Sequence, residues 1–357
     1  MKTRWLIYVC VLCSLLCEAQ DPAFGMYTEN PLVLNPALCG ANQVLRASVS
    51  YMDQWRQLGN PFKTFGMSMD MKFKPDNWQQ VDAHRGMTFK ERTMSRLAGG
   101  LSIYSDKAGI SRLSTLNTAL SVAYFVPLTG EQFLSFGLQA GLTQLQIENE
   151  ALLFSSQYNG NTYDKSISSG ESFDSFYRIV PDFATGILWA LHEHHKRVGE
   201  YGIKRMNVGL SMYHMNAPKQ GFFKKQYQSA YRFNMHGELV YLAPKANIGF
   251  SPSFNFAMQG STFFITAGSF VTYYFSENSK YTGLNKRSSM ALGAFYRQGN
   301  TFSFQCIYEK SEQYALGICY GVSVSEINVV SKGNAGFELL LRYTPPMAYL
   351  YEKKQSN

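Results

Sequence analysis

The chain has 357 residues and a formal net charge of +8, and its length suits either two soluble domains or one large barrel. Charged residues make up only 16% of it, against ~25% in an average soluble domain. Aromatic residues reach 15%, with 23 Tyr and 26 Phe. Because no long Lys/Arg run or basic helix accompanies the positive charge, the composition argues against nucleic-acid binding. It also argues against an ordinary solvated surface.

Residues 1–19 have the pattern of a secretory signal peptide. Lys2 and Arg4 form a charged start, residues 5–16 an apolar run, and small residues precede a cleavage site before Gln20. The apolar run is too short to span a bilayer as a helix. A lipoprotein would need small residues directly before Cys17, where two leucines stand. We therefore predict a cleaved signal peptide.

Residues 20–43 form a separate segment that contains two Asn-Pro pairs. Each proline fixes its own φ and keeps the residue before it out of the helical region. The segment is therefore predicted to be a series of fixed turns rather than a strand. Its apolar residues are expected to pack against the rest of the protein, and we predict that it caps or plugs the domain that follows. The pairs are Asn30-Pro31 and Asn35-Pro36, and the apolar residues are Phe24, Met26, Leu32 and Leu34.

Residues 44–344 repeat a two-residue alternation. In residues 133–146, Leu, Phe and Ala alternate with Ser, Gly, Gln and Thr, as in a β-strand with one apolar and one polar face. About 9–11 tilted residues can cross a bilayer as a strand. Similar runs occupy residues 45–51, 65–73, 97–103, 116–126, 185–191, 206–212, 233–239, 248–256, 263–273, 290–296, 302–308, 314–320 and 337–343.

No stretch after residue 19 is long and apolar enough for a membrane helix, so a closed barrel is the remaining way to satisfy every backbone group in lipid. The sequence therefore predicts an all-β fold, a transmembrane antiparallel β-barrel of about fourteen strands. Tyrosines and phenylalanines near strand ends fit an aromatic girdle. The link over residues 147–179 is expected outside the cell. Residues 345–357 are expected to form a periplasmic tail, and the link 74–96 is unusually long and basic for the periplasmic side.

Several polar groups could carry chemistry, but none has a specific pattern. His192, Glu193, His194 and His195 lack the H-E-x-x-H spacing of a metal site, so a solvated turn is the preferred interpretation. No G-x-S-x-G elbow, P-loop or dinucleotide fingerprint is present. A barrel enzyme that uses Ser and His is an alternative, although no pair stands out. We therefore predict no enzyme activity, no metal and no cofactor.

The predicted inward faces hold mainly small and amide residues with few charges. His236 and Glu238 share one such face, Glu338 and Arg342 share another, and such groups are expected to pair across the lumen. The cysteines outside the signal peptide could form one bridge but are better interpreted as small apolar fillers. They are Cys39, Cys306 and Cys319.

The segment MYTENPLVLNPALCGANQ, with the following QW and PFKT, resembles the opening of the PorP/SprF family of Bacteroidetes outer-membrane proteins. SDKAG at 105–109, VGLSMYHMNAPKQ at 208–220 and SPSFNF at 251–256 resemble later parts of that family. Met26 stands where the family has Gln, and PPMAYLYEKKQSN follows the last strand in place of a terminal aromatic residue. The matching positions that we single out as structural motif residues are Tyr27, Asn30, Pro31, Asn35, Pro36, Gly40, Trp55, Lys63, Asp106, Gly109 and Pro218.

The resemblance implies a barrel of the type IX secretion and gliding system in the cell outer membrane. Such a barrel would bind and anchor, or help export, a large secreted surface protein through its C-terminal domain. The implied partners are outer-membrane lipid, a secreted adhesin or other cargo protein, and periplasmic secretion components. A passive porin, an outer-membrane enzyme and a secreted soluble β protein are the alternatives. Porins carry rings of charged residues around a constriction, which the inward faces do not suggest.

Overall fold

The computed structural model describes residues 23–58, 61–73, 77–83, 87–93, 96–109, 113–147, 154–164, 166–168, 176–192, 202–220, 227–243, 247–275, 287–299, 301–324 and 333–345. The predicted signal peptide, the tail beyond residue 345, and residues 193–195 of the histidine-rich link lie outside these ranges.

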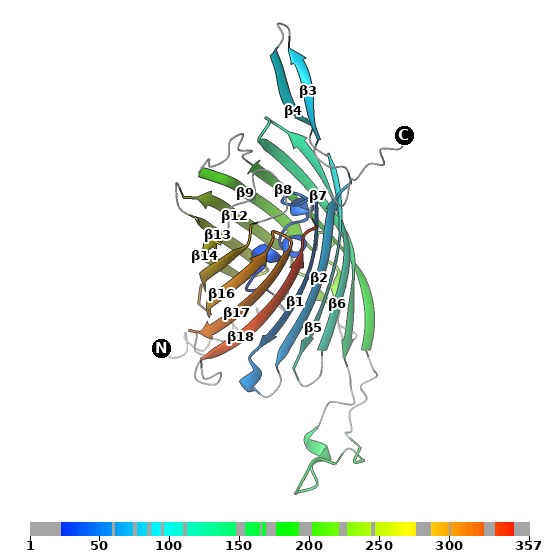
Figure 1. Cartoon of the computed structure of the whole chain (residues 1–357). Coiled ribbons are helices and arrows are strands. Elements are labelled where there is room, and N and C mark those ends of the chain that lie inside the picture. Colours follow the sequence, from blue (N-terminus) through cyan, green and yellow to red (C-terminus); the bar gives the residue numbers. More distant parts are fainter. Residues whose placement is uncertain are drawn as a thin grey trace, which may run out of the picture.

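Within the described residues, fourteen antiparallel strands close into one barrel (Figure 1), as the alternation predicts. Each wall strand pairs with the wall strands that precede and follow it in the sequence. The barrel is closed by the pairing of β18 with β1, for example Leu341 with Val49. The strands are β1 (Leu45–Gln54), β2 (Phe62–Lys72), β5 (Leu97–Ala108), β6 (Leu113–Pro127), β7 (Gln132–Ile147), β8 (Phe176–His192), β9 (Gly202–Tyr213), β12 (Arg232–Leu242), β13 (Ile248–Gln259), β14 (Thr262–Tyr274), β15 (Ser289–Arg297), β16 (Thr301–Lys310), β17 (Tyr314–Ser323) and β18 (Asn334–Tyr343).

The two ends of the barrel differ. We call the end where β1 begins and β18 finishes the proximal end, and the opposite one the distal end. Between β2 and β5, the link that the sequence marks as unusually long and basic contains a hairpin of β3 (Asn77–Ala83) and β4 (Met87–Thr93), which extends from the proximal end (Figure 1). The distal end carries the short pair β10 (Lys219–Gln220) and β11 (Tyr227–Gln228), the turns η3 (Arg56–Leu58) and η5 (Ser155–Gln157), and the long β7–β8 connection.

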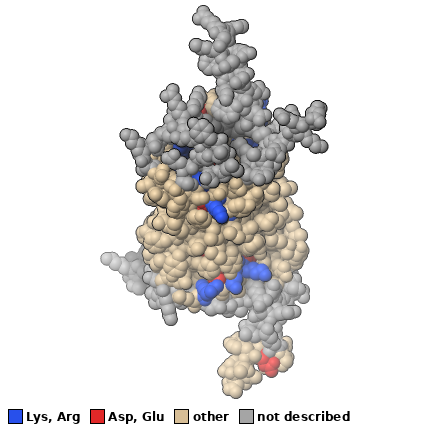
Figure 2. All heavy atoms as spheres, viewed as in Figure 1, with Lys and Arg blue, Asp and Glu red and all other residues tan. Residues whose placement is uncertain are grey.

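The outer surface of the barrel is apolar. On β2, Phe65, Met67 and Met69 are 40–47% exposed, whereas the alternating Thr64 and Ser68 point inward and are buried. Figure 2 shows that charged side chains on this face gather toward the ends and leave an uncharged band between them. Tyrosines predicted near strand ends are exposed on the same surface: Tyr124, Tyr273, Tyr296, Tyr308 and Tyr343. Among the described residues, no helix is long and apolar enough to cross a membrane.

The residues before β1 form short helical turns inside the barrel (Figure 1). They are η1 (Tyr27–Glu29), α2 (Pro31–Leu34) and η2 (Pro36–Leu38). Pro31 and Pro36 begin α2 and η2, because the missing N–H of proline costs nothing in the first turn of a helix. The predicted turns and the predicted packing are confirmed, since Phe24, Met26, Leu32 and Leu34 are all buried.

Candidate functional site: the N-terminal segment inside the barrel

Residues 23–44, which we call the lumen segment, begin near the distal end of the barrel and finish near its proximal end. At the distal end, Arg297, the last residue of β15, donates hydrogen bonds to the carbonyls of Ala23 and Phe24, at 3.3 and 3.1 Å. Near the proximal end, the Gly40 N–H donates to Asp70 Oδ2 at 2.8 Å, and the chain then enters β1. The segment therefore contacts the wall along its whole course.

Asn35 is the most heavily bonded side chain of the lumen segment. Its Oδ1 accepts from the Ala37 N–H at 2.8 Å and so caps η2. Its Nδ2 lies 3.2 Å from the carbonyl oxygens of Ile187 and Leu210 and 3.1 Å from His236 Nε2. One fully buried amide thus joins the lumen segment to three adjacent strands, β8, β9 and β12.

Glycines in the wall make room for this contact. A Cβ on Gly209 would lie 2.6 Å from Asn35 Nδ2, and a Cβ on Gly186 or Gly137 would overlap the Asn35 side chain or the Ala37 backbone. Gly137 and Gly186 face each other across β7 and β8. The inward strand faces are therefore small at these positions because the lumen segment approaches them closely.

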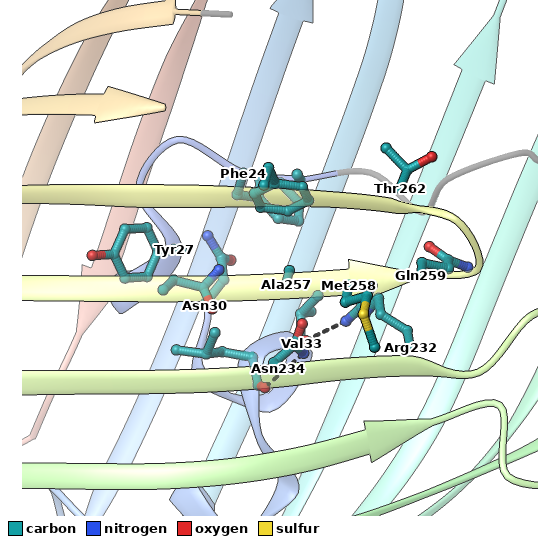
Figure 3. A pocket seen from close by; sticks show the side chains of 14 residues that line it. Phe24, Tyr27, Asn30, Val33, Arg232, Asn234, Ala257, Met258, Gln259 and Thr262 are labelled. Atoms are coloured by element: carbon teal, nitrogen blue, oxygen red, sulfur yellow. Dashed lines mark hydrogen bonds between the residues drawn. The ribbon is translucent and has the colours of Figure 1, made fainter. Parts of the chain in front are cut away.

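Side-chain donors of the wall bind the backbone carbonyls of the lumen segment. Arg232 donates to the Val33 carbonyl at 2.8 Å, and Asn234 donates to the Leu34 carbonyl at 3.1 Å (Figure 3). Further contacts of this kind run from Tyr213 to Leu32, from Ser211 to Leu34 and from Ser135 to Ala37, at 3.0, 2.7 and 2.8 Å. Because a buried carbonyl without a partner costs free energy, these donors fix the path of the segment.

Two further residues of the Asn-Pro motif bind the wall through their side chains. The Tyr27 hydroxyl lies 2.9 Å from Ser253 Oγ, and its ring meets Phe295 edge-on with centroids 6.1 Å apart. Ser50 Oγ donates to Asn30 Oδ1 at 3.1 Å. Gly40 has a left-handed φ of +64°, and a Cβ there would lie 2.5 Å from Ala98 Cβ, so both its conformation and its surroundings require glycine.

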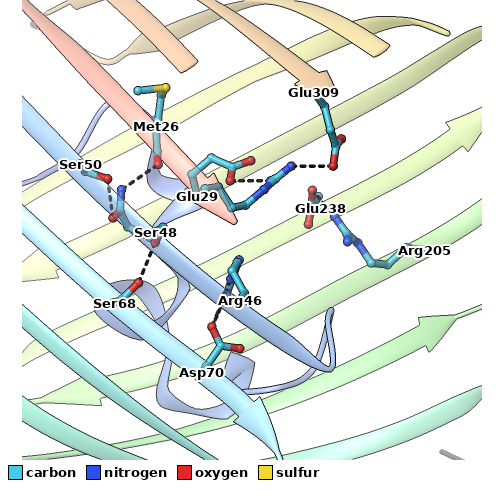
Figure 4. A network of polar contacts seen from close by, with 12 residues as sticks. Met26, Glu29, Arg46, Ser48, Ser50, Ser68, Asp70, Arg205, Glu238 and Glu309 are labelled. Carbon is cyan, nitrogen blue, oxygen red and sulfur yellow. Dashed lines mark hydrogen bonds and ion pairs between the residues drawn. The ribbon is translucent and has the colours of Figure 1, made fainter. Parts of the chain in front are cut away.

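Charged groups hold the proximal part of the lumen segment (Figure 4). The Arg342 guanidinium binds Glu29 at 2.7 Å and Glu309 at 3.1 Å, and Arg46 binds Asp70 at 3.1 Å. Burial favours a higher pKa for Glu29, but the charges of Arg342, Arg46 and Arg205 outweigh it and lower its pKa below the usual range. Glu29 is therefore held as a carboxylate.

The expectation that the inward faces carry few charges is wrong. Buried or half-buried ion pairs occur at Arg46–Asp70, Arg205–Glu238 and Arg342–Glu29. The expected pairing across the lumen also differs in its partners. Glu238 binds Arg205 on the neighbouring strand, and Glu338 accepts hydrogen bonds from the Gly25 and Met26 N–H groups. The two partners of each ion pair come from different elements, so the pairs are visible only once the strands are assembled.

The lumen segment leaves unequal spaces on its two sides. A polar cavity of about 420 Å³ lies toward the proximal end and is lined by Glu29, Arg205, Glu238 and Arg342 among others. Elsewhere, between the lumen segment and the wall, the cavities described are about 20–50 Å³. The described part of the chain has no group of three or more His, Cys, Asp or Glu placed to hold a metal ion.

The cysteines and the histidine-rich link are placed as follows. Among the described residues, Cys39, Cys306 and Cys319 are free, so the alternative of one disulfide is wrong. Cys39 and Cys319 are buried. His192 ends β8 and packs edge-on against Phe133 with ring centroids 5.1 Å apart, while its neighbours in the sequence motif lie outside the described residues.

The structure divides the predicted motif residues into two groups. Tyr27, Asn30, Pro31, Asn35, Pro36 and Gly40 meet in the lumen, whereas the others lie at the distal end. There, Trp55 has a left-handed φ of 52° and packs edge-on against Phe62. Asp106 accepts from Thr64 Oγ1 at 2.6 Å. Lys63 is exposed, Gly109 turns the chain after β5 with φ +69°, and Pro218 is buried in the β9–β12 connection.

Residues 16–343 match the sequence profile of the family described as "Type IX secretion system membrane protein PorP/SprF". The chain belongs to the PorP/SprF family. As a PorP/SprF membrane protein that forms a closed barrel with an apolar outer band, it is an outer-membrane β-barrel. A comparison with curated protein sequences gives no match.

Solved structures similar to this PorP/SprF barrel are other β-barrels of low sequence identity. The toluene transporter TbuX of Ralstonia pickettii is 11% identical, with a TM-score of 0.41 over 88% of this chain and 92% of its own. CdiB from Acinetobacter baumannii is 9% identical, with a TM-score of 0.40 over 84% of this chain and 60% of its own. BamA from Haemophilus ducreyi is 9% identical, with a TM-score of 0.38 over 84% and 69%.

Proposed function

We propose that this PorP/SprF barrel is a non-enzymatic outer-membrane receptor whose own lumen is closed by residues 23–44. In this proposal it binds and anchors, or helps export, a large secreted surface protein through that protein's C-terminal domain. The observation that carries the proposal is the bonding of the lumen segment to strands around the wall, from Arg297 at one end to Asp70 near the other. A barrel closed in this way suits docking of a partner better than free passage of solutes.

The passive porin remains the second candidate. Charged groups do line the lumen, which is a porin-like feature. However, Glu29 and Asp70 are engaged by Arg342 and Arg46, and Glu29 belongs to the lumen segment itself. These charges therefore hold a segment in place, which supports a closed barrel more than a selective ring around open water.

The orientation follows from the general construction of outer-membrane barrels. Their short turns face the periplasm, and their long connections face outward. Here the β6–β7 and β16–β17 turns at the proximal end are short, and the long β7–β8 connection is distal. We therefore assign the proximal end, with the β3–β4 hairpin and the residues 345–357 tail, to the periplasm. The hairpin is then available to periplasmic secretion components.

In this proposal the domain division remains signal peptide 1–19, Asn-Pro segment 20–43, barrel 44–344 and tail 345–357. The lumen motif residues act as structural residues of the closed barrel: Tyr27, Asn30, Pro31, Asn35, Pro36 and Gly40. The distal motif residues shape the end that faces the secreted protein: Trp55, Lys63, Asp106, Gly109 and Pro218.

Co-purification from native membranes tests the proposed function. The barrel, tagged after residue 357, is extracted from outer membranes of the source organism in mild detergent, and bound proteins are identified by mass spectrometry. The proposal predicts a large secreted protein that remains bound, and loses binding when its C-terminal domain is deleted. A barrel that comes away alone and conducts ions steadily in a planar bilayer would favour the porin instead.

A further inference from the structure

The distal β7–β8 connection contains a compact loop, residues 154–168, described except for residue 165 and projecting beyond the barrel (Figure 1). Gln157 is buried at its base, where Gln157 Oε1 accepts from the Phe154 N–H at 3.1 Å and Nε2 donates to the Ile167 carbonyl at 3.0 Å. The Asp164 N–H donates to the Gln157 carbonyl at 2.8 Å. The loop is therefore ordered by hydrogen bonds within itself.

The tip of the loop is a tight turn held by one asparagine. Asn159 Oδ1 accepts from the N–H groups of Asn161 and Thr162 at 3.0 and 2.9 Å, and Gly160 has a φ of +95°. This is the local side-chain bonding that makes asparagine and glycine favourable in turns. Because the turn is fixed, the residues on either side of it are fixed as well.

Tyr158 and Tyr163 flank this turn as an exposed pair. They form an antiparallel bridge, their ring centroids lie 5.3 Å apart, and they are 50% and 52% exposed. The Tyr158 hydroxyl donates to the Gly160 carbonyl at 3.0 Å, which orients its ring. The two rings cover part of each other's surface, and the rest of both rings is exposed to water at the distal tip.

The composition of the loop, FSSQYNGNTYDKSIS, is rich in Tyr, Ser, Asn and Gly. The same residues dominate antibody paratopes, because tyrosine gives a large contact area at low entropic cost and the small polar residues adapt their hydrogen bonds. Among the described loop residues, the charged side chain is Asp164, and Ser166 donates to it through both its hydroxyl and its N–H, at 2.7 and 2.9 Å. These bonds lower the pKa of Asp164, so they favour its carboxylate form.

We propose that the Tyr158–Tyr163 tip is the docking surface for the C-terminal domain of the secreted protein. This inference rests on the proposed function and adds the contact site. The distal end is the one assigned to the cell exterior, where an exported domain emerges. Paired tyrosines at a pre-ordered tip have the character of interface hot spots, which are enriched in tyrosine and lose affinity when truncated. A tip of aromatic rings and amides makes the contact largely independent of salt.

The probe is the purified C-terminal domain of the protein that mass spectrometry identifies with the wild-type barrel, and the measurement is its affinity for full-length barrel in detergent. Tyr158→Ala with Tyr163→Ala is expected to weaken binding by at least about thirtyfold, from the usual cost of truncating hot-spot residues. The matched control is Tyr231→Ala, a 45% exposed tyrosine beside β12 at the same end. It is expected to change affinity by less than about threefold, as surface contacts outside hot spots do.

A second variant separates loss of the rings from disruption of the loop. Tyr158→Phe with Tyr163→Phe keeps both rings and is expected to bind within about threefold of the wild type. Affinity is expected to change little between about 0.1 and 1 M salt. Unchanged binding by the Ala pair overturns the docking site while leaving the proposed function intact. A wild-type barrel that binds no secreted protein overturns both.

Discussion

Glu29 Oε2 lies 2.7 Å from Nη1 of Arg342, which joins the first turn of the lumen segment to the last strand of the barrel. Arg342 also binds Glu309 on β16 at 3.1 Å, so one guanidinium bridges the lumen segment and the wall. This contact faces the polar cavity of about 420 Å³ at the proximal end. Titration of Glu29 therefore acts directly on the attachment of the lumen segment.

Acid is expected to loosen the lumen segment through Glu29. Its pKa is lowered in the attached state, whereas in a released segment it returns to about 4.3. The released state then binds more protons, so the contribution of Glu29 to attachment is complete above about pH 4.3 and is lost as the pH falls through the lowered pKa of the attached state. Permeation of a small sugar into proteoliposomes is expected to rise below that pH. Glu29→Gln should show a smaller rise than the wild type, and an equal rise would contradict this role.

Cys39 provides a chemical readout of attachment at neutral pH. It is fully buried in the lumen segment, and burial raises the pKa of its thiol above the usual range. A thiol that is both covered and protonated reacts slowly with maleimide. In a barrel with Cys306→Ala and Cys319→Ala, labelling of Cys39 therefore reports release of the segment. The following two variants are made in that background.

Gly186→Ala is expected to displace the lumen segment, because the added Cβ overlaps the Asn35 side chain. Overpacking of this kind costs about 1–3 kcal/mol. Labelling of Cys39 should accelerate by about tenfold or more, the factor that corresponds to about 1.4 kcal/mol. Gly130→Ala is the control, since a Cβ there meets nothing within 4 Å. Equal labelling rates in the two variants would show that the wall does not need glycine at residue 186.

Asn35→Ala removes the side-chain cap of η2 and leaves the Ile187 and Leu210 carbonyls without the amide that donates to them. The loss of these bonds from a buried site is expected to cost about 1–3 kcal/mol of attachment, again raising the Cys39 labelling rate. Asn159→Ala is the control, because that asparagine also bonds backbone N–H groups but lies in the exposed loop. If Cys39 is labelled as slowly in Asn35→Ala as in Asn159→Ala, the Asn35 amide is not needed to hold the lumen segment.

Asp70→Asn is expected to destabilise the whole barrel. Asp70 and Arg46 have side chains only 1% and 5% exposed, and Asp70 also accepts from the Gly40 N–H. Removing one partner of a buried ion pair costs about 3–5 kcal/mol, because the other charge is left without compensation. The temperature at which the folded barrel loses its fast electrophoretic mobility should fall clearly, while exposed Asp164→Asn leaves it unchanged. Identical transition temperatures would exclude a structural role for the pair.

The barrel itself could be predicted because each strand carries its own signal. Residues 134–143 alternate between apolar and polar, and β7, which contains them, spans Gln132–Ile147. The Asn-Pro turns were equally local, since Pro31 and Pro36 begin their helical turns where proline is favoured. In both cases the decisive interactions lie within a few residues of one another.

The polar network could not be predicted in the same way. Glu29 meets Arg342 and Asn35 meets His236 only after the strands close, and these partners are hundreds of positions apart in the chain. The alternation places Gly137 and Gly186 on the inward face but does not show that the Ala37 backbone and the Asn35 side chain occupy the space beside them. A lone inward carboxylate such as Asp70 on a Met- and Ser-rich strand was the visible sign of a buried partner.

Single-channel conductance in a planar bilayer tests the central claim most directly, by comparing the full barrel with one that lacks residues 24–38. The closed-lumen account predicts almost no current from the full barrel at neutral pH and steady, large-conductance openings from the deletion. Folding of both proteins is checked by heat-dependent electrophoretic mobility. Equal conductance in the two folded proteins would contradict closure of the lumen by its own N-terminal segment.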